Sequence, residues 1–121
     1  MATTLTREAL LSKSKPIYRE VDVKGFGRVG IRQQSEMRRI QRTNQLFDGS
    51  GNVNPMHADR RRVYMLIDQL MVDESTPMFS ESDIETLMDG GSEHYDPLIT
   101  AIGEFNKSVD PEKNDGGESN E

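Results

Sequence analysis

The sequence predicts a small α+β domain in which one N-terminal antiparallel β-hairpin packs on three or four helices. Two observations predict this fold class. Two segments of alternating apolar and polar residues flank a glycine turn, and apolar residues follow helical spacing after residue 35. The 121-residue chain has no cysteine, which excludes a disulfide framework and a thiolate site. We expect an N-terminal arm with a short helix over 1–15, one domain over 16–107 and a disordered acidic tail over 108–121.

The hairpin is predicted at about 17–32. Apolar and polar residues alternate in "VDVK" and again in "RVGIR", which is the period of half-buried strands. Between these segments, Gly25 and Gly27 supply the positive φ angles of a tight turn, with Phe26 at its tip. Gly30, on the second strand, then marks a bulge or a close approach of another backbone.

The same glycines match G-x-G-x-x-G, in which a strand normally turns into a helix whose N-terminus binds pyrophosphate. After Gly30 the alternation of a strand continues, so no helix is expected there. A kinase-type glycine loop needs a lysine on a following strand, and no lysine occurs between Lys24 and Lys107. The sequence therefore predicts a hairpin turn and not a phosphate-binding loop.

Capping residues mark the next helices. Thr6 is expected to cap a short helix over 7–11, ahead of Pro16, and Ser35 to cap a second helix. In this second helix we expect an inward face of Met37, Ile40 and Phe47 and an outward face of Arg38, Arg39 and Arg42. The Gly, Asn and Pro content of 48–55 predicts a loop.

The best helical pattern covers about 56–72, with apolar residues at core spacing. These residues are Val63, Leu66, Ile67 and Leu70, flanked by Tyr64 and Met71. Because this helix carries more apolar residues than one core contact requires, we expect Tyr64, Met65 and Met71 to border a second apolar surface. That surface would serve self-association or an amphipathic client helix. The alternative is that the hairpin covers one side of this helix and the last helix covers the other.

Two helices are predicted after Pro77. Ser80 and Asp83 have the spacing of a capping box, with Phe79 and Ile84 as a hydrophobic staple and Gly90 as the stop. The last helix is predicted from Asp96 to about Lys107, with a start at Ser92 and a distortion at Pro97 as the alternative. Its inward residues are expected to be Leu98, Ile99, Ile102 and Phe105.

The net charge of −6 is unevenly distributed. Residues 1–71 carry 13 Lys and Arg against 7 Asp and Glu, whereas residues 72–121 carry 2 against 14. This split favours head-to-tail contacts between copies or a basic partner for the acidic half, with solvated faces as the alternative. Because no apolar run reaches membrane-span length and no signal peptide opens the chain, we expect a cytoplasmic protein without membrane association.

No catalytic or cofactor-binding pattern is found, so the sequence predicts a non-enzymatic protein without metal or cofactor. The loop at 48–59 approaches calcium-loop spacing, but Val53 replaces the required glycine and Asp59 the bidentate Glu. His57 and His94 are isolated histidines.

Further interaction candidates are Phe26 and the arginines Arg60, Arg61 and Arg62. Together with Arg38, Arg39 and Arg42, these arginines could contact phosphates. The acidic pI and the lack of an exposed aromatic set argue against nucleic acid. Solvated helix faces or a patch for an acidic protein partner explain these arginines better.

The order of these pieces resembles the tail assembly chaperone family of long-tailed bacteriophages. The resemblance covers roughly residues 4–107: an "LTREALL" opening, a glycine-turn hairpin ending in Arg32, a polar helix and an amphipathic helix. Its most specific part is 63–89, which contains "VDESTPMFSESDIETL". The connector "DGSGNVNPMHADRRR" and Pro97 depart from the family pattern and bear on the helix packing.

The resemblance implies a non-enzymatic protein of the host cytoplasm. It implies binding of the tape-measure protein while the tail tube is built, and absence from the mature virion. It further implies a longer frameshifted form that recruits tail tube protein. The alternative is a small adaptor that binds nucleic acid or protein through its arginine clusters.

Overall fold

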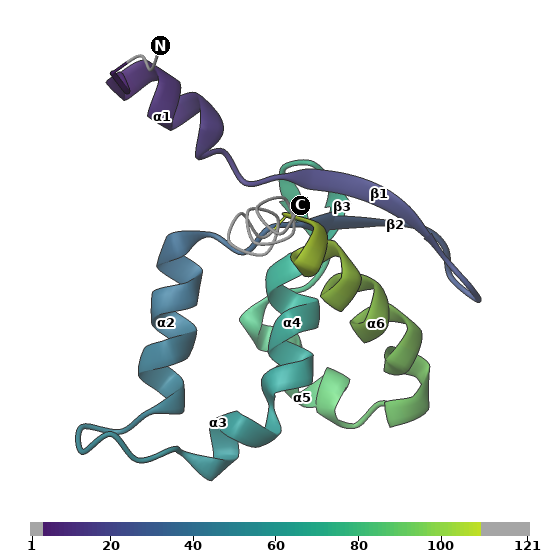
Figure 1. Cartoon of the computed structure of the whole chain (residues 1–121). Coiled ribbons are helices and arrows are strands. Elements are labelled where there is room, and N and C mark those ends of the chain that lie inside the picture. Colours follow the sequence, from purple (N-terminus) through teal and green to yellow (C-terminus); the bar gives the residue numbers. More distant parts are fainter. Residues whose placement is uncertain (1–3, 110–121) are drawn as a thin grey trace, which may run out of the picture.

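The structure is a computed structural model that describes residues 4–109, and it confirms the predicted α+β class: helices packed around a small antiparallel sheet (Figure 1). The first half of the described chain contains α1 (Arg7–Lys13), β1 (Tyr18–Val23), β2 (Gly27–Arg32), α2 (Glu36–Leu46) and α3 (Pro55–Asp59). The second half contains α4 (Arg61–Gln69), β3 (Leu70–Asp73), β4 (Thr76–Pro77), the 3-10 turn η1 (Glu81–Asp83), α5 (Ile84–Met88) and α6 (Ser92–Val109). Within residues 4–109, no helix has both the length and the apolar character that crossing a membrane requires.

The predicted hairpin is confirmed. β1 and β2 pair antiparallel from Tyr18 opposite Arg32 to Val23 opposite Gly27. Gly25 and Gly27 have φ values of 90° and 80°, a backbone conformation that other residues rarely adopt. The glycine segment therefore joins strand to strand, as expected, and Phe26 lies exposed in the turn.

The sheet extends beyond the hairpin, which the sequence did not predict. Its order is β1-β2-β3-β4, with all neighbouring pairs antiparallel. The single helix predicted over 56–72 is thus wrong in two places. It is divided into α3 and α4 at Arg60, and the chain leaves α4 after Gln69 and pairs with β2. Leu70 lies opposite Ile31, and Met71 lies opposite Gly30.

Gly30 is a close-approach position, one of its two predicted roles. A side chain there would lie 2.6 Å from the Tyr18 hydroxyl and 3.0 Å from the Met71 carbonyl oxygen. The missing side chain therefore makes room for Tyr18 and for the backbone of β3. Pro77, which has no amide hydrogen to donate, lies on the edge strand β4, where this lack is tolerated.

One hydrophobic core lies between the sheet and α4, α5 and α6. Its buried members are Val23, Val29, Ile31, Val63, Leu66, Ile67, Leu70, Leu87, Leu98, Ile102, Phe105 and Val109. The four predicted core residues of the amphipathic helix are all in this set. Of the inward residues predicted for the last helix, Leu98, Ile102 and Phe105 are buried, and Ile99 is partly buried against the core.

The helix N-caps and the capping box predicted from the sequence are present in the structure. The Ser80 amide donates to the Asp83 carboxylate at 2.8 Å, which completes the predicted capping box, although the segment opens with η1 before α5. Thr6 and Ser35 accept hydrogen bonds from the Ala9 and Arg38 amides, so both predicted N-caps are confirmed. α1 continues to Lys13, beyond the predicted end at residue 11.

The last helix begins at Ser92, the alternative start, and not at Asp96. Its first turn is anchored despite Pro97. The Tyr95 hydroxyl donates to the Leu87 carbonyl at 2.7 Å, and Arg62 of α4 pairs with Asp96. The helix ends at Val109, two residues beyond the predicted Lys107, and residues 110–121 of the predicted acidic tail lie outside the described part of the chain.

The prediction for α2 is wrong in its orientation. Met37, Ile40 and Phe47, expected to face the core, are exposed. Arg42, expected to face solvent, has a side chain only 11% exposed, and Arg38 shares its inward face. The loop after α2 forms as predicted, closed by a β-bridge between Phe47 and Val53.

Candidate functional site between α2 and α4

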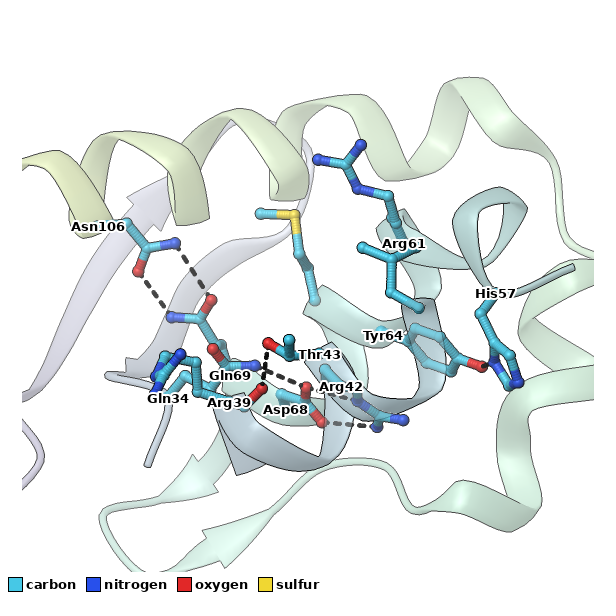
Figure 2. A pocket seen from close by; sticks show the side chains of 12 residues that line it. Gln34, Arg39, Arg42, Thr43, His57, Arg61, Tyr64, Asp68, Gln69 and Asn106 are labelled. Atoms are coloured by element: carbon cyan, nitrogen blue, oxygen red, sulfur yellow. Dashed lines mark hydrogen bonds and ion pairs between the residues drawn. The ribbon is translucent and has the colours of Figure 1, made fainter. Parts of the chain in front are cut away.

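A cleft of about 310 Å³ separates α2 from α4 (Figure 2). Ten of its twelve lining residues have polar side chains, and the lining comes from α2, α3, α4, α6 and the segment before α2. The cleft lies beside the hydrophobic core, on the side of α4 that faces α2. Its side chains decide which face of α2 is turned toward the domain.

Asp68 of α4 is the centre of the contacts across the cleft. Its side chain is 1% exposed, so its charge requires close partners. Arg42 binds it in a bidentate manner, Nε to Oδ2 at 2.9 Å and Nη2 to Oδ1 at 2.8 Å. Gln34 donates to Oδ2 at 3.1 Å, and Arg38 lies 3.5 Å from Oδ1.

Arg42 is held by three groups at once. Besides Asp68, it pairs with Glu81 of η1 at 2.6 Å, and its guanidinium lies 4.0 Å above the centre of the Tyr64 ring. Burial opposes the charge on Arg42, but the hydrogen bonds to Asp68 and Glu81 outweigh it and raise the pKa of the guanidinium. Arg42 therefore stays charged and joins α2 to both α4 and η1.

Tyr64 and His57 close the α3 side of the cleft. The Tyr64 hydroxyl lies 2.6 Å from His57 Nδ1, and the two rings stack at 6.0 Å. At the other side, Gln69 and Asn106 exchange two amide hydrogen bonds, of 2.8 and 3.2 Å. The polar groups of the cleft thus bind one another, and no buried side-chain N or O among residues 4–109 lacks a partner.

This arrangement explains the orientation of α2. Turning Met37 and Ile40 inward would remove Arg42 from Asp68 and leave a buried carboxylate without its main partner. Breaking a buried ion pair costs about 3–5 kcal/mol. Ile40 is only 44% exposed, so part of its side chain is already buried and less remains to be gained by turning it inward. The arginine face of α2 is therefore bound to the domain, and its apolar face is left in solvent.

We call this apolar face the α2 stripe and define it as Met37, Ile40 and Phe47. Met37 is 71% exposed and Ile40 is 44% exposed. Their spacing of three residues places Met37 and Ile40 on one side of α2, and Phe47 is the exposed C-cap residue that follows the helix. Val53, exposed as well, lies next to Phe47 through the β-bridge and extends the stripe into the following loop.

The structure does not bring the predicted surface residues together. Met71 is 1% exposed in β3, and Tyr64 is buried behind Arg42, so neither borders an exposed apolar surface. Met65 is partly buried at the cleft. Phe26 is exposed at the far end of the hairpin. The excess of apolar residues in 56–72 is explained by β3, which buries Leu70 and Met71 in the sheet.

The arginine clusters are largely used within the chain. Arg60 pairs with Glu85 at 3.2 Å, Arg62 with Asp96, and Arg39 with Glu36 at 2.8 Å. Arg38 and Arg42 pair with Asp68 and Glu81. Of the six clustered arginines, Arg61 alone makes no ion pair with a residue in 4–109. Several of these pairs thus join the basic half of the sequence to the acidic half within one molecule. The charge count alone did not distinguish this arrangement from contacts between copies or from solvated faces.

The remaining candidates for chemistry are metal-ligating side chains and the loop at 48–59. Among residues 4–109, no three His, Asp or Glu side chains gather in a way that could hold a metal ion. Asp48 accepts hydrogen bonds from the Ser50 and Asn52 amides, at 2.8 and 3.0 Å, as part of the turn in the loop after α2.

Comparisons with protein-family models, curated proteins and solved structures give no match to this chain.

Proposed function

We propose that this chain is a tail assembly chaperone of a long-tailed bacteriophage. It would bind the tape-measure protein in the host cytoplasm during tail tube assembly and be absent from the mature virion. A longer frameshifted form would recruit the tail tube protein. The order of elements that resembles this family supports the proposal, and the α2 stripe is the observation in the fold that carries it.

The α2 stripe suits a helical client. It presents Met37 and Ile40 at i and i+3 on α2 and Phe47 at the C-cap that follows the helix, an exposed apolar strip that could pack against an amphipathic helix laid alongside. Met37, the most exposed side chain of the stripe, is a methionine, which adapts to varied apolar partners. A tape-measure protein is a long helical client, so repeated contacts of this kind would coat it.

The ion pairs behind the stripe make it a fixed surface. Because Arg42 and Arg38 hold α2 against Asp68 and Glu81, the helix need not be ordered when a client binds. A preformed surface lowers the entropic cost of association. This surface replaces Tyr64, Met65 and Met71 as the place where we expect the client to bind.

Replacing Met37 and Ile40 together by Ser is expected to weaken binding of the tape-measure protein by at least about tenfold. Burying one such side chain completely contributes about 1.5–3 kcal/mol, and about 1.4 kcal/mol is a tenfold change. The measurement is co-purification after co-expression, followed by titration of the purified proteins. Met88→Ser on α5 is the matched control, since Met88 is also exposed. Wild-type affinity in a folded double variant would remove the α2 stripe from the proposal.

A further inference from the structure

The cleft between α2 and α4 contains one charged side chain that the fold leaves without a partner. Of the ten polar residues that line this cleft, nine form hydrogen bonds or ion pairs with other residues in 4–109. Arg61, the first residue of α4, forms none there, and Figure 2 shows its side chain apart from Arg42 and Asp68. Because Arg61 is exposed, its guanidinium is available to a group on another molecule.

The charges of the cleft lining favour an anion. Three arginines, Arg39, Arg42 and Arg61, line the cleft against one acid, Asp68. That acid is 1% exposed and is bound by Arg42, so it presents no free carboxylate to a ligand. Arg39 pairs with Glu36, which lies outside the lining. An anion that enters the cleft therefore meets the free guanidinium of Arg61 and no accessible acid of the lining.

The mouth of the cleft adjoins the α2 stripe. Thr43 and Leu46 of α2 both line the cleft. Thr43 stands three residues after Ile40 and four before Phe47, and residues at these spacings are neighbours on a helix surface. Leu46 directly precedes Phe47. A helix laid on the α2 stripe therefore has one flank beside the mouth of the cleft.

A carboxylate of a protein fits this place better than a phosphate of nucleic acid. Nucleic-acid sites combine a broad basic face with aromatic rings on which bases stack. Here five of the six clustered arginines are paired within the chain, and the aromatic ring of Tyr64 is buried beneath Arg42. One free guanidinium beside an apolar stripe matches one acidic residue at the edge of the apolar face of an amphipathic helix.

We propose that the cleft binds an Asp or Glu side chain of the helix that packs on the α2 stripe, with Arg61 as the partner of that carboxylate. This contact rests on the proposed function and adds to it the chemistry of the client, an amphipathic helix with an acid at the edge of its apolar face. The apolar contact supplies most of the affinity. The ion pair selects the register in which the client helix lies.

The test titrates the purified full chain with the purified tape-measure protein. Arg61→Gln is expected to raise the dissociation constant by at least about fivefold, because it removes a hydrogen bond to a charged group. Its binding is also expected to be less sensitive to salt. Arg7→Gln on α1 removes the same charge away from the cleft and is expected to change the constant by less than about twofold. Circular dichroism and thermal melting verify that both variants are folded.

Exchanging the charges of the pair gives the most specific outcome. Arg61→Glu is expected to bind the client more weakly than Arg61→Gln does. When the acids of the bound client segment are replaced by Lys one at a time, one client variant is expected to prefer Arg61→Glu over wild type. Wild-type affinity in Arg61→Gln, or the lack of any such client variant, would overturn the proposal.

Other occupants of the cleft give different results. Duplex DNA that binds wild type but not Arg61→Gln, with client binding unchanged, would assign the cleft to nucleic acid and overturn the proposal. Self-association lost in the same variant, again with client binding unchanged, would assign the cleft to a second copy and overturn it too. If Met37→Ser with Ile40→Ser weakens client binding and Arg61→Gln does not, the cleft proposal alone fails. A client that does not bind wild type contradicts the proposed function as well.

Discussion

Replacing Asp68 by Ala is expected to lower the free energy of unfolding by about 3 kcal/mol, a large share of the stability of a small domain. The variant loses the bidentate bond of Arg42, the Gln34 bond and the Arg38 contact. It also leaves Arg42 in a mostly buried place with Glu81 as its remaining carboxylate. Urea unfolding measures the change, and faster hydrogen exchange in α2 is expected with it.

Two variants make this prediction specific. Glu36→Gln removes an acid from an exposed pair with Arg39 and is expected to leave the free energy of unfolding nearly unchanged. Asp68→Leu combined with Arg42→Met removes both charges and is expected to recover most of the lost stability. A loss in Asp68→Ala as small as that in Glu36→Gln would mean that the ion pairs do not hold α2.

Ile102→Ala is expected to lower the free energy of unfolding by about 2–5 kcal/mol. Ile102 of α6 is 0% exposed in the middle of the core, so the substitution removes buried apolar area and leaves a cavity. Ile40→Ala, the same substitution on α2, is expected to cost no more than about 0.5 kcal/mol, because Ile40 faces solvent. Thermal and urea unfolding compare the two.

This pair of variants distinguishes the two orientations of α2. The helical spacing of the sequence favours an inward Ile40, whereas the structure places Arg42 there. Equal losses of stability in Ile40→Ala and Ile102→Ala would show that Ile40 belongs to the core and that the α2 stripe does not exist as a surface.

Local rules predicted the parts of the fold that local chemistry decides. Gly25 and Gly27 specify the hairpin turn because few residues other than glycine adopt their φ angles. Ser80 and Asp83 specify a capped start because each bonds the backbone of the other. The buried face of α4 followed from the spacing of its apolar residues.

The errors arose where distant residues decide the outcome. Leu70 fits the apolar face of a helix as well as a strand, and its pairing with Ile31 of β2, 39 positions earlier in the chain, determines which forms. The start of α6 depends on Tyr95 and Asp96 binding α5 and α4. Neither contact leaves a local pattern in the sequence.

The candidate site was missed for a similar reason. An amphipathic pattern on α2 specifies two faces but not which of them is bound, and apolar residues are normally the buried ones. One signal could have indicated the reverse: Asp68 adjoins the core residue Ile67, and Arg38 and Arg42 are spaced four apart on one side of α2. A buried acid beside two arginines on a neighbouring helix turns the charged face of that helix toward the domain.

The most direct test of the proposed function is photo-crosslinking from position 37 during tail assembly in infected cells. A photoreactive phenylalanine analogue replaces Met37 in one variant and Met88 in a control. We expect a crosslink to the tape-measure protein from position 37 and little from position 88, with no chaperone in purified mature virions. Position 37 giving no crosslink to the tape-measure protein, while the variant is folded and expressed, would contradict the proposal that this chain binds it through α2.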